Sequence, residues 1–184
     1  MEPLSAEEVV VLVDEENNVL GTQDKSAVHG ATTPLHRGFS LFLFDRRGHL
    51  LLQQRSHVKK TWPLVWSNSV CGHPTLGETN VDAAKRRLSH ELRMSATLIE
   101  EVAPYRYCFT RDGVMENEIC PILLGQTLDQ PNPNGEEVEA TRWVPWQEFL
   151  HELDEKPGFY SPWCEEEARI LDGLPRFHEV IPTK

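Results

Sequence analysis

Hydrophobic runs early in the chain predict strands. Val9–Val13 is apolar and is followed by the polar residues 14–18. Phe39–Phe44 is apolar almost throughout, and the turn residues 45–48 separate it from a second run, His49–Gln54. Short apolar runs that are bounded by turn residues are typical of buried strands. The runs Phe39–Phe44 and His49–Gln54 are therefore predicted to form a buried β-hairpin.

A change of period after residue 78 predicts a helix. Thr79 or Asn80 can cap it, and Ala84, Leu88 and Leu92 recur every four residues with no Gly or Pro before residue 94. Another helix is predicted where the cap Ser161 and a proline in the first turn precede an amphipathic run that ends at Gly173.

The remaining elements follow from the same signals. Strands are predicted at 104–109 and 114–124 around a turn at 111–113, then a loop at 129–135, a strand at 138–144 and a short helix at 146–153. Strands mixed with separated helices indicate an α+β or α/β fold. Without repeats or a Gly/Ser-rich linker, residues 1–184 are expected to form one domain, with an N-terminal extension at 1–36 and a core at 37–175.

Composition and charge narrow the class of protein. A chain of 184 residues is long enough to bury a core without disulfides, so the four cysteines are expected to be reduced. The net charge of −11 argues against binding to nucleic acid or to anionic membranes. No window approaches a membrane span, and the acidic segment 1–8 does not resemble a secretory signal, which predicts a cytoplasmic protein. An anionic ligand would need a local basic cluster or a metal.

Two short motifs place polar side chains in pairs on predicted strands. Cys71 and His73 are two residues apart, and so are Glu116 and Glu118. In an extended chain each pair leaves the same face, so a thiol and an imidazole can share one cavity, and so can two carboxylates. Any one of these residues could simply lie on the protein surface. Glu116 and Glu118, however, lie within an apolar run, so the face they share is either exposed to solvent or polar for a functional reason.

Two further histidines, His29 and His36, lie in a loop-like stretch before the first core strand. Together with His73 and the two glutamates they offer three imidazoles and two carboxylates. Such a mixed set suits Mg²⁺, Mn²⁺ or Zn²⁺ better than a thiolate-rich structural zinc site.

A third pattern surrounds the predicted helix at 79–94 and is similar to the Nudix box, Gly-x5-Glu-x7-Arg-Glu-U-x-Glu-Glu-x-Gly-U, with U aliphatic. The matching residues are Gly72, Glu78, Arg86, Leu88, Glu91 and Met94. Arg87 and His90 replace two of its glutamates, and Arg93 replaces its glycine. Nudix hydrolases use these carboxylates to hold Mg²⁺ against a diphosphate. The box therefore favours diphosphate binding but argues against hydrolysis.

These motifs, with Tyr160-Ser161-Pro162-Trp163, closely resemble those of the type 1 isopentenyl diphosphate isomerases, from about Val9 to Leu171. The resemblance implies a Nudix-like α+β fold with a mixed sheet flanked by helices. It also implies a divalent metal, Mn²⁺, Mg²⁺ or Zn²⁺, held by a set of three histidines and two glutamates: His29, His36, His73, Glu116 and Glu118. A second Mg²⁺ would bridge the substrate diphosphate to Glu91.

The resemblance further implies roles in substrate binding and catalysis. The residues that correspond to substrate contacts are Lys25, Arg55, Lys59, Arg87 and Ser69. Cys71 and Glu118 match a thiol and carboxylate pair that adds and removes protons on opposite faces of the substrate, with Tyr107 near the glutamate. The indole of Trp163 matches one that faces a tertiary carbocation.

The expected activity is therefore the conversion of isopentenyl diphosphate to dimethylallyl diphosphate in isoprenoid biosynthesis, by a monomer or weak homodimer with a small-molecule partner. A Nudix-type diphosphate hydrolase is the alternative, and a non-catalytic diphosphate-binding module is the third. Arg87 and His90 argue against the hydrolase, and the thiol beside a metal ligand argues against the module.

Overall fold

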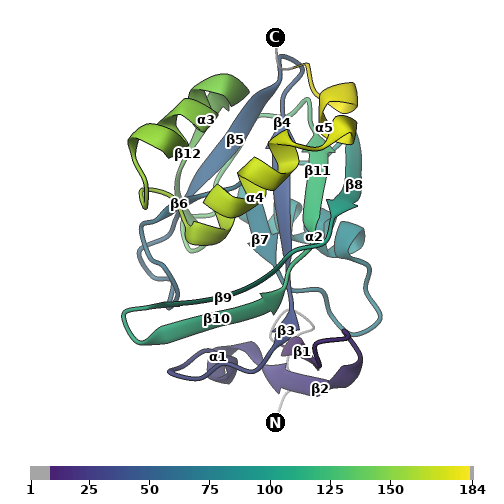
Figure 1. The fold of residues 1–184 in the computed structure, drawn as a ribbon, viewed down its shortest axis with the longest axis vertical. Helices are drawn as coiled ribbons and strands as arrows, with labels where there is room; N and C mark the ends of the chain where they lie inside the picture. The colour runs from purple at the N-terminus through teal and green to yellow at the C-terminus, as the bar shows by residue number, and fades with distance from the viewer. Residues whose placement is uncertain (1–8, 183–184) are drawn as a thin grey trace.

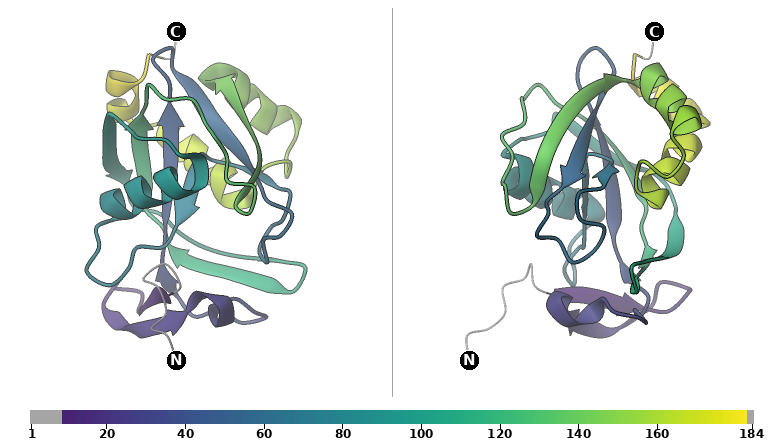
Figure 2. Two further views of the ribbon diagram at one scale, coloured as in Figure 1. Left: turned by 180° about the vertical axis from the view of Figure 1, so that it is seen from behind. Right: turned by 90° about the vertical axis from the view of Figure 1, so that its left-hand side faces the viewer.

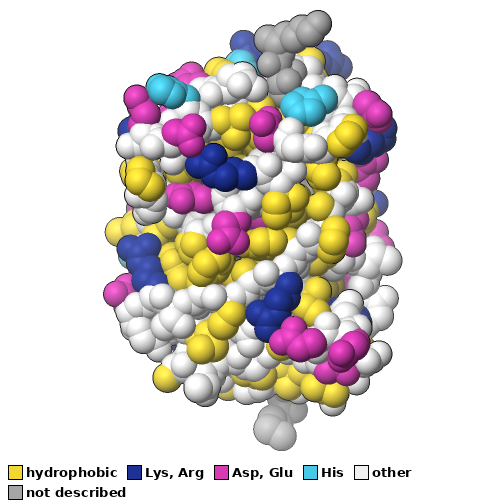
Figure 3. Space-filling view, in the orientation of Figure 1, with side chains coloured by type: hydrophobic (Ala, Val, Ile, Leu, Met, Phe, Trp, Pro, Cys, Tyr) yellow, Lys and Arg dark blue, Asp and Glu magenta, His cyan; other side chains and the backbone are white. Residues whose placement is uncertain are grey.

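The structure is a computed structural model that describes residues 9–182. The acidic segment 1–8, on which the predicted location rests, lies outside the described residues. Within the described part, no helix is both long and apolar enough to cross a bilayer. Figure 3 shows acidic and basic side chains interspersed over one face of the molecule, with hydrophobic side chains grouped in its middle.

A mixed sheet forms the centre of the molecule, with strand order β12-β5-β4-β11-β8. Its strands are β4 (Phe39–Phe44), β5 (His49–Arg55), β8 (Leu98–Ala103), β11 (Ile122–Gln126) and β12 (Val138–Pro145). The short strands β6 (Trp66–Ser67) and β7 (Val70–Gly72) pair with β5 and β4. β11 runs parallel to β4, and the other pairs are antiparallel.

Helices cover both faces of this sheet. α3 (Trp146–Glu155), α4 (Pro162–Asp172) and α5 (Pro175–Val180) lie on one face, and α2 (Asn80–Leu92) lies on the other (Figures 1 and 2). Phe42 and Phe44 therefore pack toward α3–α5, while Leu41 and Leu43 pack toward α2. Burial of each such side chain contributes about 1.5–3 kcal/mol. This double coverage explains why the run at 39–44 is apolar throughout.

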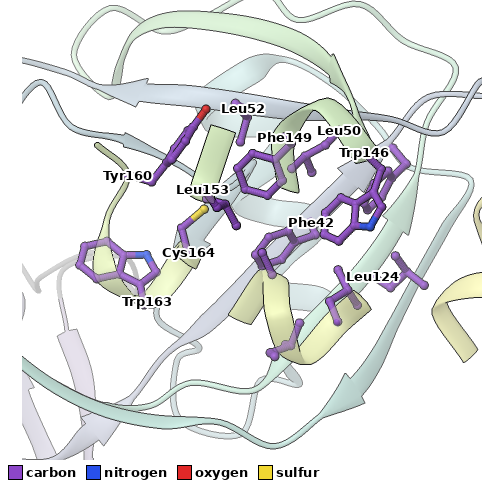
Figure 4. Close-up of a cluster of buried hydrophobic side chains, with 14 of the residues drawn as sticks. Phe42, Leu50, Leu52, Leu124, Trp146, Phe149, Leu153, Tyr160, Trp163 and Cys164 are labelled. Carbon is purple, nitrogen blue, oxygen red and sulfur yellow. The ribbon is translucent and has the colours of Figure 1, made fainter. Parts of the chain in front are cut away.

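The larger of the two hydrophobic clusters lies under α3–α5. Figure 4 shows Phe42 and Phe149 between Trp146 and Trp163, which lie toward opposite ends of the labelled side chains. Trp163 thus belongs to the core, but it also reaches the cavity described below.

A second, smaller sheet has the order β2-β1-β3-β10-β9 and lies below the first in Figure 1. Its strands come from two distant parts of the chain: β1 (Val9–Val13), β2 (Val19–Asp24) and β3 (His36–Arg37) from the first, and β9 (Arg106–Arg111) and β10 (Val114–Ile119) from the second. The one-turn helix α1 (Lys25–Val28) lies between β2 and β3 in the chain. β10 pairs with β3 in parallel and with β9 in antiparallel orientation.

Two predictions of strand structure need correction. The segment 114–124 is two strands rather than one, because Pro121 lacks a backbone N–H and the chain passes there from β10 in the small sheet to β11 in the large one. The predicted hairpin at 39–54 exists, but β4 and β5 pair only at Phe44 and Leu50. Beyond that point β4 pairs with β11 and β7, and β5 pairs with β12 and β6.

The predicted helix at 79–94 is confirmed as α2, and its ends show how the Nudix-like box is used. The Thr79 side chain caps the helix by accepting a hydrogen bond from the Asp82 backbone N–H, at 3.1 Å. Arg93 ends the helix with a φ of 51°, the left-handed conformation that glycine adopts most easily. This explains why the box has glycine at that position.

Another pair of box residues has a structural role. The Arg86 guanidinium donates two hydrogen bonds to the Glu78 carboxylate, at 2.9 and 2.8 Å, and a third to the His73 carbonyl oxygen. The hydrogen bonds from Arg86 hold the pKa of Glu78 below its usual value. This bidentate pair ties the loop after His73 to α2 and so fixes the direction of the His73 backbone.

Candidate active site

The register of the small sheet brings three of the predicted site residues into one row. Glu118 on β10 lies opposite His36 on β3 and opposite Tyr107 on β9. Cross-strand partners project from the same face of a sheet. An imidazole, a carboxylate and a phenol therefore lie side by side, and each comes from a different strand.

The three predicted histidines converge on this row. Their ring centroids lie 5.1–5.9 Å apart. Glu118 Oε1 is 3.0 Å from His73 Nε2 and 3.3 Å from His36 Nε2, and Glu116 Oε2 is 3.0 Å from His29 Nε2. One ligand atom from each of His29, His36, His73 and Glu118 lies within 4.8 Å of the others. Glu116 borders this group through His29.

The chemistry of these groups fits a bound divalent cation. Among the described residues, the buried atoms His29 Nε2, His36 Nε2 and Glu116 Oε2 lie close to other members of the cluster but make no well-aligned hydrogen bond. His36 Nδ1 lies 2.9 Å from the Pro34 carbonyl oxygen, to which it can only donate, so in the neutral imidazole Nε2 keeps its lone pair for the cluster. Adjacent ligands around an ion at about 2.1 Å are about 3 Å apart, which is the separation found at Glu118. Buried lone pairs without donors are costly unless a cation satisfies them.

Burial and neighbouring charges shift pKa values within the cluster. Although burial acts to lower the pKa of His36, the Glu118 carboxylate raises it. Burial lowers the pKa of His73 to about 4, despite the neighbouring Glu118 carboxylate. Burial would raise the pKa of Glu118, but the attraction of His73 and the close contacts of His36 and His73 hold it well below its usual value. A neutral His73 and an ionised Glu118 are the forms that ligate metal.

Gly38 allows the Glu118 carboxylate to occupy its position. A Cβ atom at residue 38 would come within 2.0 Å of Glu118 Oε2 and 2.8 Å of its Cδ. Any other residue there would push the carboxylate out of the row.

Cys71 lies on β7, opposite Ser40 on β4. Its thiol donates to Asn68 Oδ1 at 3.2 Å, and its sulfur lies 3.6 Å from Ser40 Oγ. Burial, together with a smaller contribution from Glu167, raises the pKa of this thiol to about 12. At neutral pH the group is therefore a thiol rather than a thiolate.

Aromatic rings form one wall beside these two groups. Trp163 and Tyr107 are stacked, with centroids 5.6 Å apart and planes 17° apart, and Tyr107 stacks in turn on Phe109. Trp62 meets the Trp163 ring edge to face at 5.3 Å. Burial raises the pKa of Tyr107 well above its usual value, so it stays a neutral phenol. The π faces of such a wall attract positive charge.

Basic side chains gather at the other end of the site. Lys25, Lys59 and Arg87 line the cavity there, together with the carboxylate of Glu137. Glu137 pairs with Lys59, and its Oε2 atom is 3.2 Å from the Arg87 guanidinium. Although burial acts to raise the pKa of Glu137, Lys59 and Arg87 lower it to about 2. Burial and the neighbouring cations Arg87 and Lys59 lower the pKa of Lys25 to about 8. This density of cations suits a strongly anionic ligand.

One cavity of about 670 Å³ joins these parts. Its lining includes most of the residues that the sequence selected: Lys25, His29, Arg55, Lys59, Cys71, His73, Arg87, Tyr107, Glu116, Glu118 and Trp163. His36 lies behind the lining, fully buried. Arg55 is held at the rim by three hydrogen bonds to Thr61, with its guanidinium carbon 5.9 Å from the centre of the Trp163 ring.

Two further predicted site residues, Ser69 and Glu91, are not part of the cavity lining. The Ser69 hydroxyl is fully buried between strands, where it accepts from the Leu43 backbone N–H and donates to the Leu51 carbonyl oxygen. Both capacities are thus used, and the side chain is not brought to the cavity. The Glu91 carboxylate lies beside the basic end and accepts from Arg87 at 2.6 Å and from Gln53 at 3.3 Å.

Four residues of the site were not selected from the sequence: Gly38, Ser40, Asn68 and Glu137. Asn68 lies three residues before Cys71 in the same motif, so its position in the sequence could have indicated a contact with the thiol. Glu137 follows a loop and has no spacing relation to the box, so only the fold shows that it meets Lys59 and Arg87.

Known proteins share this fold and much of this sequence. The NUDIX domain family matches residues 34–164. Among solved structures, DR0079 from Deinococcus radiodurans has a TM-score of 0.68 at 20% identity, over 89% of this chain and 98% of that one. A MutT protein from Methanosarcina mazei has a TM-score of 0.61 at 14% identity, over 76% and 94% of the two chains. The fold and the match together define a protein of the Nudix superfamily.

Curated relatives narrow this class. An isopentenyl-diphosphate Delta-isomerase of Saccharopolyspora erythraea is 44% identical over 89% of this chain and 86% of its own. The enzyme of the same name from Escherichia coli K12 is 42% identical over 96% and 98% of the two chains. Within the Nudix superfamily, the chain belongs to the type 1 isopentenyl-diphosphate Delta-isomerase family. The resemblance inferred from the motifs is confirmed.

Proposed function

We propose that the protein converts isopentenyl diphosphate to dimethylallyl diphosphate by adding a proton at one end of the double bond and removing one from the allylic carbon. The observation that carries this proposal is the placement of Cys71 on β7 and Glu118 on β10, two proton-carrying groups on different strands of one cavity. A hydrolase needs an activated water, whereas a double-bond shift needs two such groups.

The other parts of the cavity suit the same substrate. Lys25, Lys59 and Arg87 bind the diphosphate, and the hydrocarbon end then lies among the aromatic rings. Trp163 and Tyr107 present π electrons to the tertiary carbocation between the two proton transfers. An indole has no basic lone pair, so it stabilises the cation with little risk of alkylation.

We assign a divalent ion, Mg²⁺, Mn²⁺ or Zn²⁺, to His29, His36, His73, Glu116 and Glu118, which would hold it. A second ion, Mg²⁺, would be held by Glu91 and would offset the charge of the diphosphate. When bound at the histidine cluster, the ion supplies positive charge that sets the protonation state of Glu118. Ionised Glu118 would take up a proton at its carboxylate, and Tyr107 lies next to it in the same row.

The direct test is to incubate the protein with isopentenyl diphosphate and Mg²⁺ in D₂O and to follow dimethylallyl diphosphate and inorganic phosphate separately. We expect dimethylallyl diphosphate, with solvent deuterium in its new methyl group, because proton addition and removal use different groups. Release of phosphate without isomer would identify a hydrolase. An isomer free of deuterium would contradict the two-group mechanism.

Arg87 gives a second prediction, since it takes the place of a metal-binding glutamate of the Nudix box. We expect the double variant Arg87→Glu, His90→Glu to bind substrate at least about tenfold more weakly, seen as a higher KM, because it loses a charge-assisted contact to the diphosphate. It should not gain phosphate release.

The side chain of Arg87 is buried between Glu91 and Glu137, so a third carboxylate there also risks the fold. The variant Arg87→Gln keeps the size without the charge and should raise KM in the same direction. An unchanged KM in a folded Arg87→Gln protein would exclude a phosphate contact for Arg87.

A further inference from the structure

Glu137 is an acidic side chain at the basic end of the cavity, and the proposed reaction assigns it no role. It directly precedes β12, and its carboxylate lines the cavity. A single oxygen atom, Oε2, contacts the Lys59 ammonium and lies 3.2 Å from Nη2 of Arg87. The other oxygen, Oε1, lies 3.6 Å from His90 Nε2. The carboxylate therefore bridges two cations that would otherwise face a ligand.

The contact with Arg87 uses donors that Glu91 leaves available. Glu91 Oε1 accepts from Nε of Arg87 at 3.1 Å and from Nη2 at 2.6 Å, which occupies one edge of the planar guanidinium. A guanidinium can bind a second oxyanion through its remaining donors. Glu137 lies close to Nη2, so a phosphate group that binds Arg87 from the cavity meets this carboxylate.

The backbone fixes the position of Glu137. Its N–H donates to the Asn134 carbonyl oxygen at 2.9 Å, and its own carbonyl oxygen accepts from the Ser56 N–H at 3.1 Å. Ser56 lies in the segment that carries Lys59. The carboxylate and its ammonium partner are thus held on adjoining segments of backbone.

We propose that Glu137 is an internal counter-anion: its carboxylate occupies the place between Lys59 and Arg87 that a phosphate group of the ligand takes, so the ligand has to displace it. Two anions that share these cations repel each other. Glu137 therefore lowers the affinity for diphosphate, and in the free protein it offsets the mutual repulsion of the cations that line this end. The inference rests on the proposed function, because it concerns the diphosphate site of that reaction.

A limit on diphosphate affinity suits an isomerase. The substrate and the product of the proposed reaction carry the same diphosphate, so contacts to this group hold both molecules equally. Binding that is equally strong for both does not speed the proton transfers, and it slows the release of product. A counter-anion at the diphosphate site weakens this shared binding and leaves the groups around the hydrocarbon end unchanged.

Glu137→Gln tests the inference through binding alone. Glutamine keeps the size of the side chain and can still accept from Lys59, but it carries no negative charge. We expect its affinity for inorganic diphosphate, measured calorimetrically in Mg²⁺ buffer, to be at least about fivefold higher than that of the parent. Without added Mg²⁺ the gain should be larger, because no ion then offsets the charge of the ligand. Glu137→Asp keeps the charge on a shorter side chain and should show a smaller gain, which decides the question if Glu137→Gln does not fold.

Glu139→Gln is the matched control. It makes the same change in net charge two residues further along β12, where Glu139 is exposed, pairs with His57 and lies outside the cavity lining. Its affinity for inorganic diphosphate should stay within about twofold of the parental value, because exposed charges at a distance are screened.

The outcomes separate this inference from the proposed function. If the parent binds diphosphate and Glu137→Gln binds it equally or more weakly, the inference is overturned and the diphosphate site stands. Weaker binding confined to Mg²⁺ buffer would make Glu137 a ligand of the ion instead. Equal gains in Glu137→Gln and Glu139→Gln would reduce the effect to net charge and so contradict a local role. If neither the parent nor any variant binds diphosphate, the inference and the diphosphate site fail together.

Discussion

Cys71→Ser is expected to lower isomerase turnover by about a hundredfold to ten-thousandfold, while bound metal stays at the parental level. Serine keeps a hydroxyl of similar size beside Asn68 and Ser40, so the cavity should not collapse. The substitution removes the thiol, which is a much stronger acid than the serine hydroxyl that replaces it. Turnover is measured by formation of dimethylallyl diphosphate, and metal by elemental analysis of the purified protein.

Cys108→Ser is the matched control, because Cys108 is an exposed thiol on β9 outside the cavity lining. It should behave like the parent in both measurements. Near-parental turnover of Cys71→Ser would exclude the thiol as a proton carrier. A fall in metal content along with activity would mean that the substitution disturbs His73 rather than the chemistry.

Local pattern was sufficient for the elements whose sequence signals agree with their surroundings. The helix after Thr79 was predictable because its cap and its four-residue period have a local cause. The helix after Ser161 was also correct, but Ser161 does not cap it with its side chain; its hydroxyl bonds to that of Ser67, at 2.7 Å. In that case a tertiary contact took the place of the local one.

Strand pairing was less accessible, since it depends on segments far apart in the chain. β2 and β8 were not predicted, because Gly21 interrupts the first and Glu100 and Glu101 break the alternation of the second. The sharp turn of the chain at Pro121 has a local signal, but its result, a change from one sheet to the other, does not.

The site divides in the same way. Glu116 and Glu118 reveal themselves by a spacing of two residues on β10, and Cys71 and His73 by the same spacing at the end of β7. Ser40 and Glu137 have no such spacing, and they join the site only through what they contact after folding: the Cys71 sulfur and a pair of cations. Sequence patterns thus favour groups that act in pairs along one element over groups that act across elements.

His73→Ala is expected to lower the affinity for a divalent ion at least about a hundredfold and to abolish turnover, because it removes a ligand at the centre of the cluster. Glu116→Ala should lower both by less, since Glu116 meets the cluster only through His29, whereas His73 contacts Glu118 directly at 3.0 Å. Calorimetric titration of the metal-free parent and variants with Mn²⁺ measures their affinities for the ion and shows which substitution weakens binding more.

Thermal unfolding provides a second reading that does not depend on activity. An ion at a hundred times its dissociation constant stabilises the folded protein by about 2.7 kcal/mol, which for a chain of this size raises the Tm by about 5 to 10 °C. The parent should show this rise, and His73→Ala should show little of it at the same ion concentration. His57→Ala is the control, because His57 is exposed and pairs with Glu139 away from the cluster. Full metal occupancy and a parental rise in Tm in His73→Ala would place the ion elsewhere, even if turnover were lost.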